Sequence, residues 1–394
     1  MTSSSEIIHD CTTMILKYLF DFIGRENIVS VILTGSVARD QATYKYIDGK
    51  PFLESDLDLV VVVKRIATIK SFISIKRLSK KVTNELKKKR LLSHVSLSIT
   101  TEKALLHASP SIFYQDLNLN GKVIFGKEIH SQLRKYETNE IPIQDVYRLI
   151  FNRMVESLEA LVISGAIEKK ITSDGFDLLL KRIAKLNFAL IQAILIKQGV
   201  LIFNAFDLTK ILTENPSKLE TNSQAFKSLL KSHEDLNRTI KMQENYSIAL
   251  IEECWFRIIS QFNLILTKLS GINDDALPNL VSKKKFLFED EPSSQKVKSF
   301  VAIFLQYFEI RKVADFLRFI IFTIRFGSDY VYFPLYELFL SSVIILKFED
   351  EGNTEYYQRL FNSSEAKSSK VYSKKKWLEL FNQYLKIWIF KTGN

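Results

Sequence analysis

The chain has 394 residues, 46% of them hydrophobic and 25% charged, and a formal net charge of +11. This balance is that of a globular protein, long enough for two or three domains and a sizeable core. The two cysteines are far apart and no CxxC motif is present, which argues against a structural zinc site. The N-terminus lacks a signal-peptide pattern, so we expect a cytoplasmic protein.

The positive charge has two interpretations. It can serve an anionic partner such as a nucleotide, a nucleic acid or a membrane surface. It can equally be a lysine-rich, solvated surface with no partner, and the lysines are indeed spread along the whole chain.

The first 130 residues alternate between helical and strand patterns. Apolar residues have helical spacing over 7–22 and 68–90, and the second of these segments has a basic face. Strand patterns cover 29–34, 57–63, 93–100 and 121–128. We therefore expect an α+β fold, with a small mixed-sheet domain over 1–135.

The sequence pattern changes after about residue 140, and from there on it is almost entirely helical. Helical spacing covers 143–167, 175–200, roughly 222–270 and 294–326. This predicts an all-helical region, divided into a helical bundle domain over 140–280 and a C-terminal helical region over 294–394. The polar stretch 282–296 is typical of a linker between them.

Two apolar segments near the C-terminus raise the question of membrane contact. Residues 330–348 are nearly long enough to span a bilayer, but Pro334 and Glu337 interrupt them and favour a buried helix. The basic tail 374–391 places Trp377, Phe381, Tyr384 and Trp388 on one helical stripe. That stripe can pack on its own domain or lie on an anionic membrane surface.

A pair of carboxylates stands at the start of the strongest strand pattern, in the sequence SDLDLVVVV. Residues two apart on a strand point to the same face, so Asp56 and Asp58 project together while Leu57 and Leu59 face the core. Placing both charges there without a cation would be costly. Magnesium that also holds substrate phosphates is bound by such carboxylates, and we expect Mg²⁺ here.

A glycine-serine step ends the preceding strand pattern. Gly35 would let backbone N–H groups approach phosphates closely, and the hydroxyl group of Ser36 would add a donor.

These two motifs, VILTGSVARD followed by SDLDLVVVV, resemble the nucleotidyltransferase superfamily with a DNA polymerase beta-like catalytic core. The resemblance covers residues 30–130. It implies transfer of a nucleoside monophosphate from an NTP such as ATP to an acceptor hydroxyl, amine or phosphate, with Mg²⁺ and release of pyrophosphate. By position, Gly35 and Ser36 would bind the triphosphate, and Asp56 and Asp58 would bind metal and carry catalysis.

Further expectations follow from the same resemblance. Arg39 stands where members often have a basic residue after the turn, and we assign it to nucleotide binding. The helical region looks like the partner domain of small-substrate members, so the acceptor is expected to be a small molecule. A protein side chain or an RNA is an alternative acceptor, although the sequence contains no RNA-binding motif.

The chain departs from the family pattern in the length of one connection. Nineteen residues, 37–55, separate Ser36 from Asp56, and the Asp48-Gly49 step within them predicts a hairpin. Tyr44 and Tyr46 of that hairpin either stack on the acceptor or are merely solvated.

A second departure concerns the third carboxylate that the family usually carries on a neighbouring strand. The strand pattern HVSLSIT has Ser96 and Ser98 where an acid is expected. Candidate substitutes for this acid are Glu54, Glu102, Glu156 and Glu159. The lack of a clear general base leaves open a catalytically degenerate protein that only binds nucleotide or has a regulatory role.

Two lysines in the helical region complete the candidate site residues. Lys181 and Lys185 lie four residues apart and so on one helix face. They either clamp the triphosphate or belong to a solvated face.

Overall fold

The computed structural model describes residues 4–64, 68–214, 224–242, 247–270, 332–347 and 374–392. The chain forms two compact units, residues 1–141 and 142–392, and each is described by itself. The predicted linker 282–296 and the helix predicted over 294–326 lie outside the described residues.

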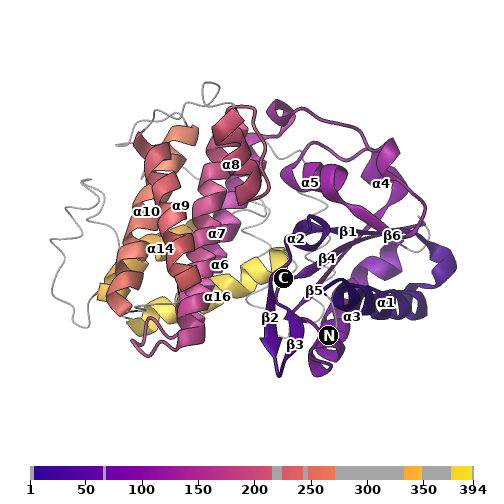
Figure 1. Cartoon of the computed structure of the whole chain (residues 1–394), viewed down its shortest axis with the longest axis horizontal. Helices are drawn as coiled ribbons and strands as arrows, with labels where there is room; N and C mark the ends of the chain where they lie inside the picture. The colour runs from indigo at the N-terminus through magenta and orange to yellow at the C-terminus, as the bar shows by residue number, and fades with distance from the viewer. Residues whose placement is uncertain are drawn as a thin grey trace. The chain divides into compact units, whose positions relative to one another are not determined.

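A four-stranded mixed sheet is the centre of the first unit, in the order β5-β4-β1-β6 (Figure 1). Its strands are β1 (Ile28–Thr34), β4 (Leu57–Val63), β5 (Val95–Thr101) and β6 (Lys122–Gly126). β1 runs antiparallel to both β4 and β6, whereas β4 and β5 are parallel. The predicted α+β fold, a mixed sheet followed by a helical region, is confirmed.

Helices cover both faces of this sheet, as Figure 1 shows. The first unit contains α1 (Ser4–Ile23), η1 (Arg25–Asn27), α2 (Gly35–Ala38), α3 (Thr68–Lys88), α4 (Glu102–Leu106), α5 (Ile112–Asn120), η3 (His130–Gln132) and η4 (Thr138–Glu140). Leu59 and Val61 of β4 pack in one core with α1 and α3. Val60 and Val62 pack in a second core with Leu117 of α5. Burial on both faces explains why β4 is a continuous apolar run.

The long connection after β1 contains the predicted hairpin, β2 (Tyr44–Ile47) and β3 (Lys50–Leu53). Asp48 and Gly49 at its tip have φ values of 51° and 74°, which suits a tight hairpin turn. At its base, the peptide N–H of Thr43 donates to Ser55 Oγ at 2.8 Å. At its tip, Asp48 forms an ion pair with Arg90, just beyond α3. The hairpin is therefore fastened at both ends.

The second unit is all-helical over its described residues. It contains α6 (Ile143–Ile163), α7 (Ser173–Lys197), α8 (Ala205–Glu214), α9 (Gln224–Met242), α10 (Ile248–Ser270), α14 (Tyr332–Lys347) and α16 (Lys374–Thr392). α7 packs against α6, α9 and α10, so it forms the middle of the bundle. Its start is fixed by Thr172, whose hydroxyl group accepts from the Gly175 N–H at 3.1 Å.

Tryptophan side chains join the C-terminal helices to this bundle. Trp255 of α10 donates to Ser342 Oγ of α14 at 2.7 Å, and Trp388 of α16 donates to Asn152 Oδ1 of α6 at 3.1 Å. Trp377 donates to the Leu338 carbonyl at 3.1 Å, and Phe381 is buried too. The aromatic stripe of the tail thus packs within its own unit. In the part of the chain that the structure describes, no helix is both long and apolar enough for a membrane span.

Candidate functional site

The glycine-serine turn and Asp58 meet at the end of the sheet where β1 ends and β4 begins. Thr34, the last residue of β1, pairs with Asp58 across the antiparallel ladder, and Gly35 follows with a φ of 72°. A Cβ atom placed on Gly35 would lie 2.5 Å from Asp58 Oδ2. Both the backbone conformation and the close approach therefore require glycine. The two motifs, more than 20 residues apart in the sequence, are in contact.

The aspartates differ in their exposure. Asp56 directly precedes β4 and is exposed, whereas Asp58 lies within the strand and is half-buried. Leu57 and Leu59 beside them are fully buried in the core that contains α1 and α3. Asp58 accordingly belongs to the opposite face, the face of Val60 that packs against α5.

Arg39 directly follows the short helix α2 and is tied to α5. Its guanidinium group forms an ion pair with Asp116, and its Nε donates to Gln41 Oε1 at 3.2 Å. Both side chains of the ion pair are largely buried. Arg39 thus holds the turn against α5, a structural role that no sequence pattern indicates. Its assignment to nucleotide binding stays a prediction.

The structure locates the position of the absent third carboxylate. Ser96 of β5 is in register with Asp58, and Ser98 is in register with Val60. The hydroxyl group of Ser98 donates to the Leu59 carbonyl at 3.3 Å. Serine therefore occupies the position beside Asp58 where the family pattern would place an acid.

Of the two substitute acids in this unit, Glu102 is in the wrong place. It follows the far end of β5, about 17 Å along the strand from Ser96 at 3.3 Å per residue. There it binds Lys127 Nζ at 2.5 Å. Glu54 is at the correct edge, where its peptide N–H donates to the Thr43 carbonyl at 2.9 Å. The described residues contain no group of three or more His, Cys, Asp or Glu side chains arranged to hold a metal.

The donor set at this edge fits one kind of metal site. Mg²⁺ is usually bound by one or two carboxylates together with water and substrate phosphates, not by a closed protein cage. Asp56 and Asp58 supply two carboxylates, and the absence of a side chain on Gly35 lets the Asp58 carboxylate lie close to the backbone of the turn. The residues therefore fit Mg²⁺ that arrives with a polyphosphate.

The candidates in the second unit already have partners there. Lys181 forms an ion pair with Asp177 at 2.7 Å. Glu156 binds Arg153 at 2.7 Å and Arg182 at 2.8 Å. Burial raises the pKa of Glu156, but the two arginines outweigh it and the pKa is lowered, with a smaller contribution from Lys185. The assignments of Lys181 and Lys185 to the nucleotide stay predictions.

Glu159 differs from Glu156 although both lie on α6. Burial raises its pKa, and Arg182 opposes this only in part. Its role as a substitute acid likewise stays a prediction.

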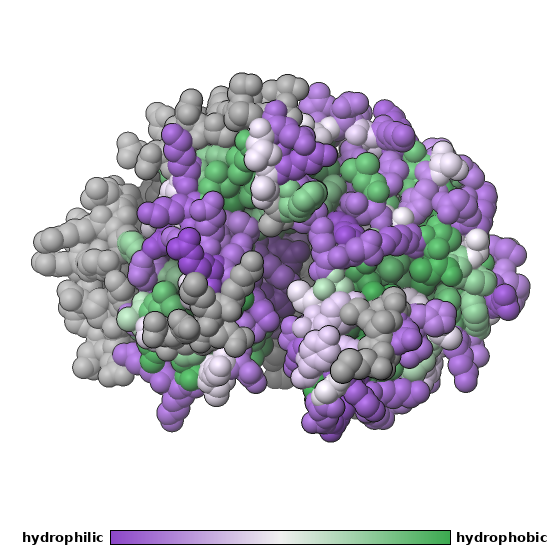
Figure 2. All heavy atoms as spheres, in the orientation of Figure 1, coloured by the Kyte–Doolittle hydropathy of each residue, from purple (hydrophilic) through white to green (hydrophobic). Residues whose placement is uncertain are grey.

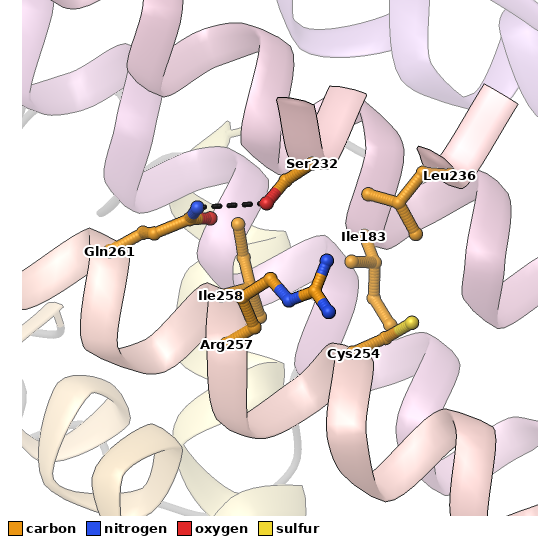
Figure 3. Close-up of a pocket in the computed structure, with 7 residues that line it drawn as sticks. All are labelled: Ile183, Ser232, Leu236, Cys254, Arg257, Ile258 and Gln261. Atoms are coloured by element: carbon orange, nitrogen blue, oxygen red, sulfur yellow. Dashed lines mark hydrogen bonds between the residues drawn. The ribbon is translucent and has the colours of Figure 1, made fainter. Parts of the chain in front are cut away.

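Two hollows in the second unit were not indicated by any sequence motif. The smaller, of about 10 Å³, lies between α7, α9 and α10, and has room for about one water molecule (Figure 3). Gln261 donates to Ser232 Oγ there at 2.9 Å. The larger hollow, of about 420 Å³, is lined by α8 and α9 and includes His233. Burial lowers the pKa of His233, which favours its neutral form.

Comparison with known proteins gives a weak likeness to solved structures. No protein-family model matches the chain, and no curated protein matches it. The chain is similar to the crystal structure of spectinomycin adenyltransferase AAD(9) from Enterococcus faecialis with ATP and spectinomycin. The match has 17% identity and a TM-score of 0.33, and covers 64% of this chain and 98% of that one. The function proposed below therefore rests on this chain's own residues.

Proposed function

We propose that the first unit binds an NTP with Mg²⁺ and transfers its nucleoside monophosphate to a hydroxyl group of a small-molecule acceptor. One observation carries this proposal: the backbone of Gly35 touches the carboxylate of Asp58. A phosphate chain bound along the turn would consequently lie beside the aspartates, so that the metal ligands and the phosphate site are one site.

Each residue of this edge has a distinct role in the proposal. Backbone N–H groups at Gly35 and Ser36 bind the triphosphate, and the Ser36 hydroxyl group adds a donor. Asp56 and Asp58 hold the Mg²⁺, which when bound neutralises charge on the phosphates. Arg39, held by Asp116, fixes the turn at the place where the phosphates bind. Catalysis would come from positioning and charge neutralisation, as is general for phosphoryl transfer.

The choice of a small-molecule acceptor depends on the resemblance of the helical region to the partner domain of small-substrate nucleotidyltransferases. Tyr46 of the hairpin is an exposed aromatic side chain in the same unit, and Tyr44 is half-buried against the core. Burial raises the pKa of Tyr44, so this tyrosine stays neutral.

A second candidate function is nucleotide binding without transfer. Ser96 in register with Asp58 favours it, because a serine hydroxyl group neither carries the negative charge of a metal ligand nor serves as a general base at neutral pH. The two functions share the phosphate site and differ only in whether pyrophosphate is released.

The test measures binding and chemistry separately on the full chain. Binding of each labelled NTP is measured with and without Mg²⁺, and pyrophosphate release is measured with a pool of hydroxyl-bearing acceptors. The comparison uses a double variant, Asp56→Asn with Asp58→Asn, and a control, Asp21→Asn, which changes an exposed aspartate on α1.

We expect Mg²⁺-dependent NTP binding and acceptor-dependent pyrophosphate release by the wild type and the control, and neither by the double variant. Binding without pyrophosphate release for any acceptor would favour the binding-only protein. Equal Mg²⁺-NTP affinity of the double variant and the wild type would refute the site.

A further inference from the structure

The exposed side of α3 carries a stripe of positive charge. The stripe consists of Arg77, Lys80, Lys81, Lys87 and Lys88, all of which are exposed. At 3.6 residues per turn these five positions lie within an arc of about 120°. The opposite side of the helix is buried in the core through Ile75, Leu78, Val82 and Leu86.

The stripe is long and nearly free of acids. It extends about 17 Å from Arg77 to Lys88 at 1.5 Å per residue. Glu85 is the single acid in the sequence of α3, and it pairs with Lys88 Nζ at 2.9 Å. The repulsion among so many like charges disfavours the helix in isolation, whereas an anionic partner would relieve it.

The hairpin β2–β3 continues this stripe. Arg90, two residues beyond the end of α3, binds Asp48 at the hairpin tip. Lys45 and Lys50 are exposed on one face of the hairpin, and Tyr46, which is 74% exposed, projects from the other face. Figure 2 shows hydrophilic residues along the lower rim of this unit, where Figure 1 places the hairpin tip. The hairpin thus carries an exposed aromatic ring as well as exposed lysines, and its tip is joined to the end of α3 by an ion pair.

We propose that this surface, the exposed side of α3 together with the hairpin, binds single-stranded nucleic acid. Lysine and arginine side chains along α3 would contact successive phosphates, which gives an affinity independent of sequence. Tyr46 would stack on an unpaired base, and such stacking is how basic grooves prefer single strands.

Two alternative anionic partners fit the surface less well. An anionic lipid surface also attracts lysines, but stable attachment of a helix uses apolar side chains that insert, and the apolar side of α3 is used in the core. A duplex keeps its bases stacked inside, so it would leave Tyr46 without a base to contact.

The α3 part of the proposed surface is separate from the nucleotide site. α3 packs on the face of the sheet that contains Leu57 and Leu59, while Asp58 belongs to the opposite face. Nucleic-acid binding therefore does not require the aspartates, and the two proposals can fail independently.

The experiment measures binding of the full chain to a fluorescein-labelled 20-nucleotide oligouridine by fluorescence anisotropy, between 50 and 200 mM salt, roughly the range over which such contacts weaken strongly. The test variant combines Lys80→Gln, Lys81→Gln and Lys87→Gln. The matched control combines Lys210→Gln, Lys227→Gln and Lys231→Gln, three exposed lysines on α8 and α9. Both variants lose the same charge, so only the place of the charge differs.

We expect the slope of log affinity against log salt to fall by about 2 in the test variant, since each phosphate contact to a single strand contributes about 0.7. The control variant should keep the wild-type slope. An equal decrease of this slope in the two variants would overturn the proposal, as would a wild type that does not bind oligouridine at the lowest salt.

A second pair of variants tests stacking without changing charge. Tyr46→Ala should weaken binding roughly fivefold or more, with the salt slope unchanged, while Tyr46→Phe should bind as the wild type does. Asp58→Asn should also bind oligouridine normally. Tighter binding to a duplex of the same length, or binding to phosphatidylserine vesicles but not to oligouridine, would contradict a single-strand surface.

Discussion

Two carboxylates of this protein, Asp58 and Glu156, are held in opposite ways. Glu156 lies inside a helical bundle, and two arginines of the same unit contact both its oxygens. Asp58 lies at the edge of a sheet, against the bare backbone of Gly35. Glu156 has a packed side-chain environment, whereas Asp58 has a neighbour without a side chain.

This difference in environment indicates a different role for each carboxylate. A buried carboxylate that is neutralised by arginines is part of the fold, because its removal would leave those arginines without their partner. A carboxylate that lies beside a glycine turn at the end of a strand suits a ligand that brings its own cation. The comparison predicts that Asp58 matters for activity and Glu156 for stability.

The largest expected effect is on chemistry at Asp58. Asp58→Asn should lower the rate of pyrophosphate release by more than about 100-fold, because a lost metal ligand weakens charge neutralisation by several kcal/mol. The melting temperature should change by only a few degrees. A variant that unfolds, or one that keeps its activity, would contradict the assignment of Asp58 to activity and not to stability.

The next effect is on stability at Glu156. Glu156→Gln should lower the free energy of unfolding by about 2 kcal/mol, less than for a fully buried ion pair because Arg153 and Arg182 are about a third exposed. Urea unfolding followed by circular dichroism measures this. An unchanged unfolding midpoint would show that the cluster is not structural.

The same glutamate predicts a pH dependence. Its pKa in the folded protein is lowered from the ordinary value of 4.5. Its contribution to stability is therefore fully present above pH 4.5 and is lost as the pH falls through the folded pKa. Below pH 4.5 the stability difference between the wild type and Glu156→Gln should narrow, and a constant difference would contradict the lowered pKa.

Glycine at the turn gives a smaller effect with a matched control. Gly35→Ala should weaken Mg²⁺-NTP binding about tenfold, because the new methyl group would push Asp58 aside and strain a positive φ by about 1–2 kcal/mol. Gly49→Ala has a similar φ of 74° but open space around it, so it should strain the backbone without affecting the nucleotide. Equal effects on affinity would mean that strain alone is responsible.

The smallest effect tests the serine beside Asp58. Ser96→Asp should lower the Mg²⁺ concentration for half-maximal NTP binding a few-fold, since neighbouring strands lie about 4.8 Å apart and a third carboxylate would face the metal. Ser98→Asp, in register with Val60, is the control. If both substitutions act alike, the register does not determine the site.

Local patterns predicted much of the first unit because strands and tight turns leave a short-range signal. The contact between Gly35 and Asp58 follows from two strand ends that meet in an antiparallel pair. The ion pair of Arg39 with Asp116 joins residues 77 positions apart and leaves no periodic signal, so it was missed. Glu102 is close to Ser98 in the sequence, but β5 runs parallel to β4 and so carries Glu102 away from Asp58. Strand direction is a property of the topology that a local pattern does not show.

The late position of β6 in the sequence has a consequence for folding during synthesis. Every residue proposed for the nucleotide site in the first unit precedes residue 60, and the strands β1 and β4 can pair once about 65 residues are available. β6 pairs with β1 from 89 positions later, since Leu33 is opposite Lys122. Until β6 is synthesised, β1 is an open apolar edge that invites pairing with other chains. A fragment that ends before Lys122 would retain the aspartates and the glycine turn, and would be prone to aggregate.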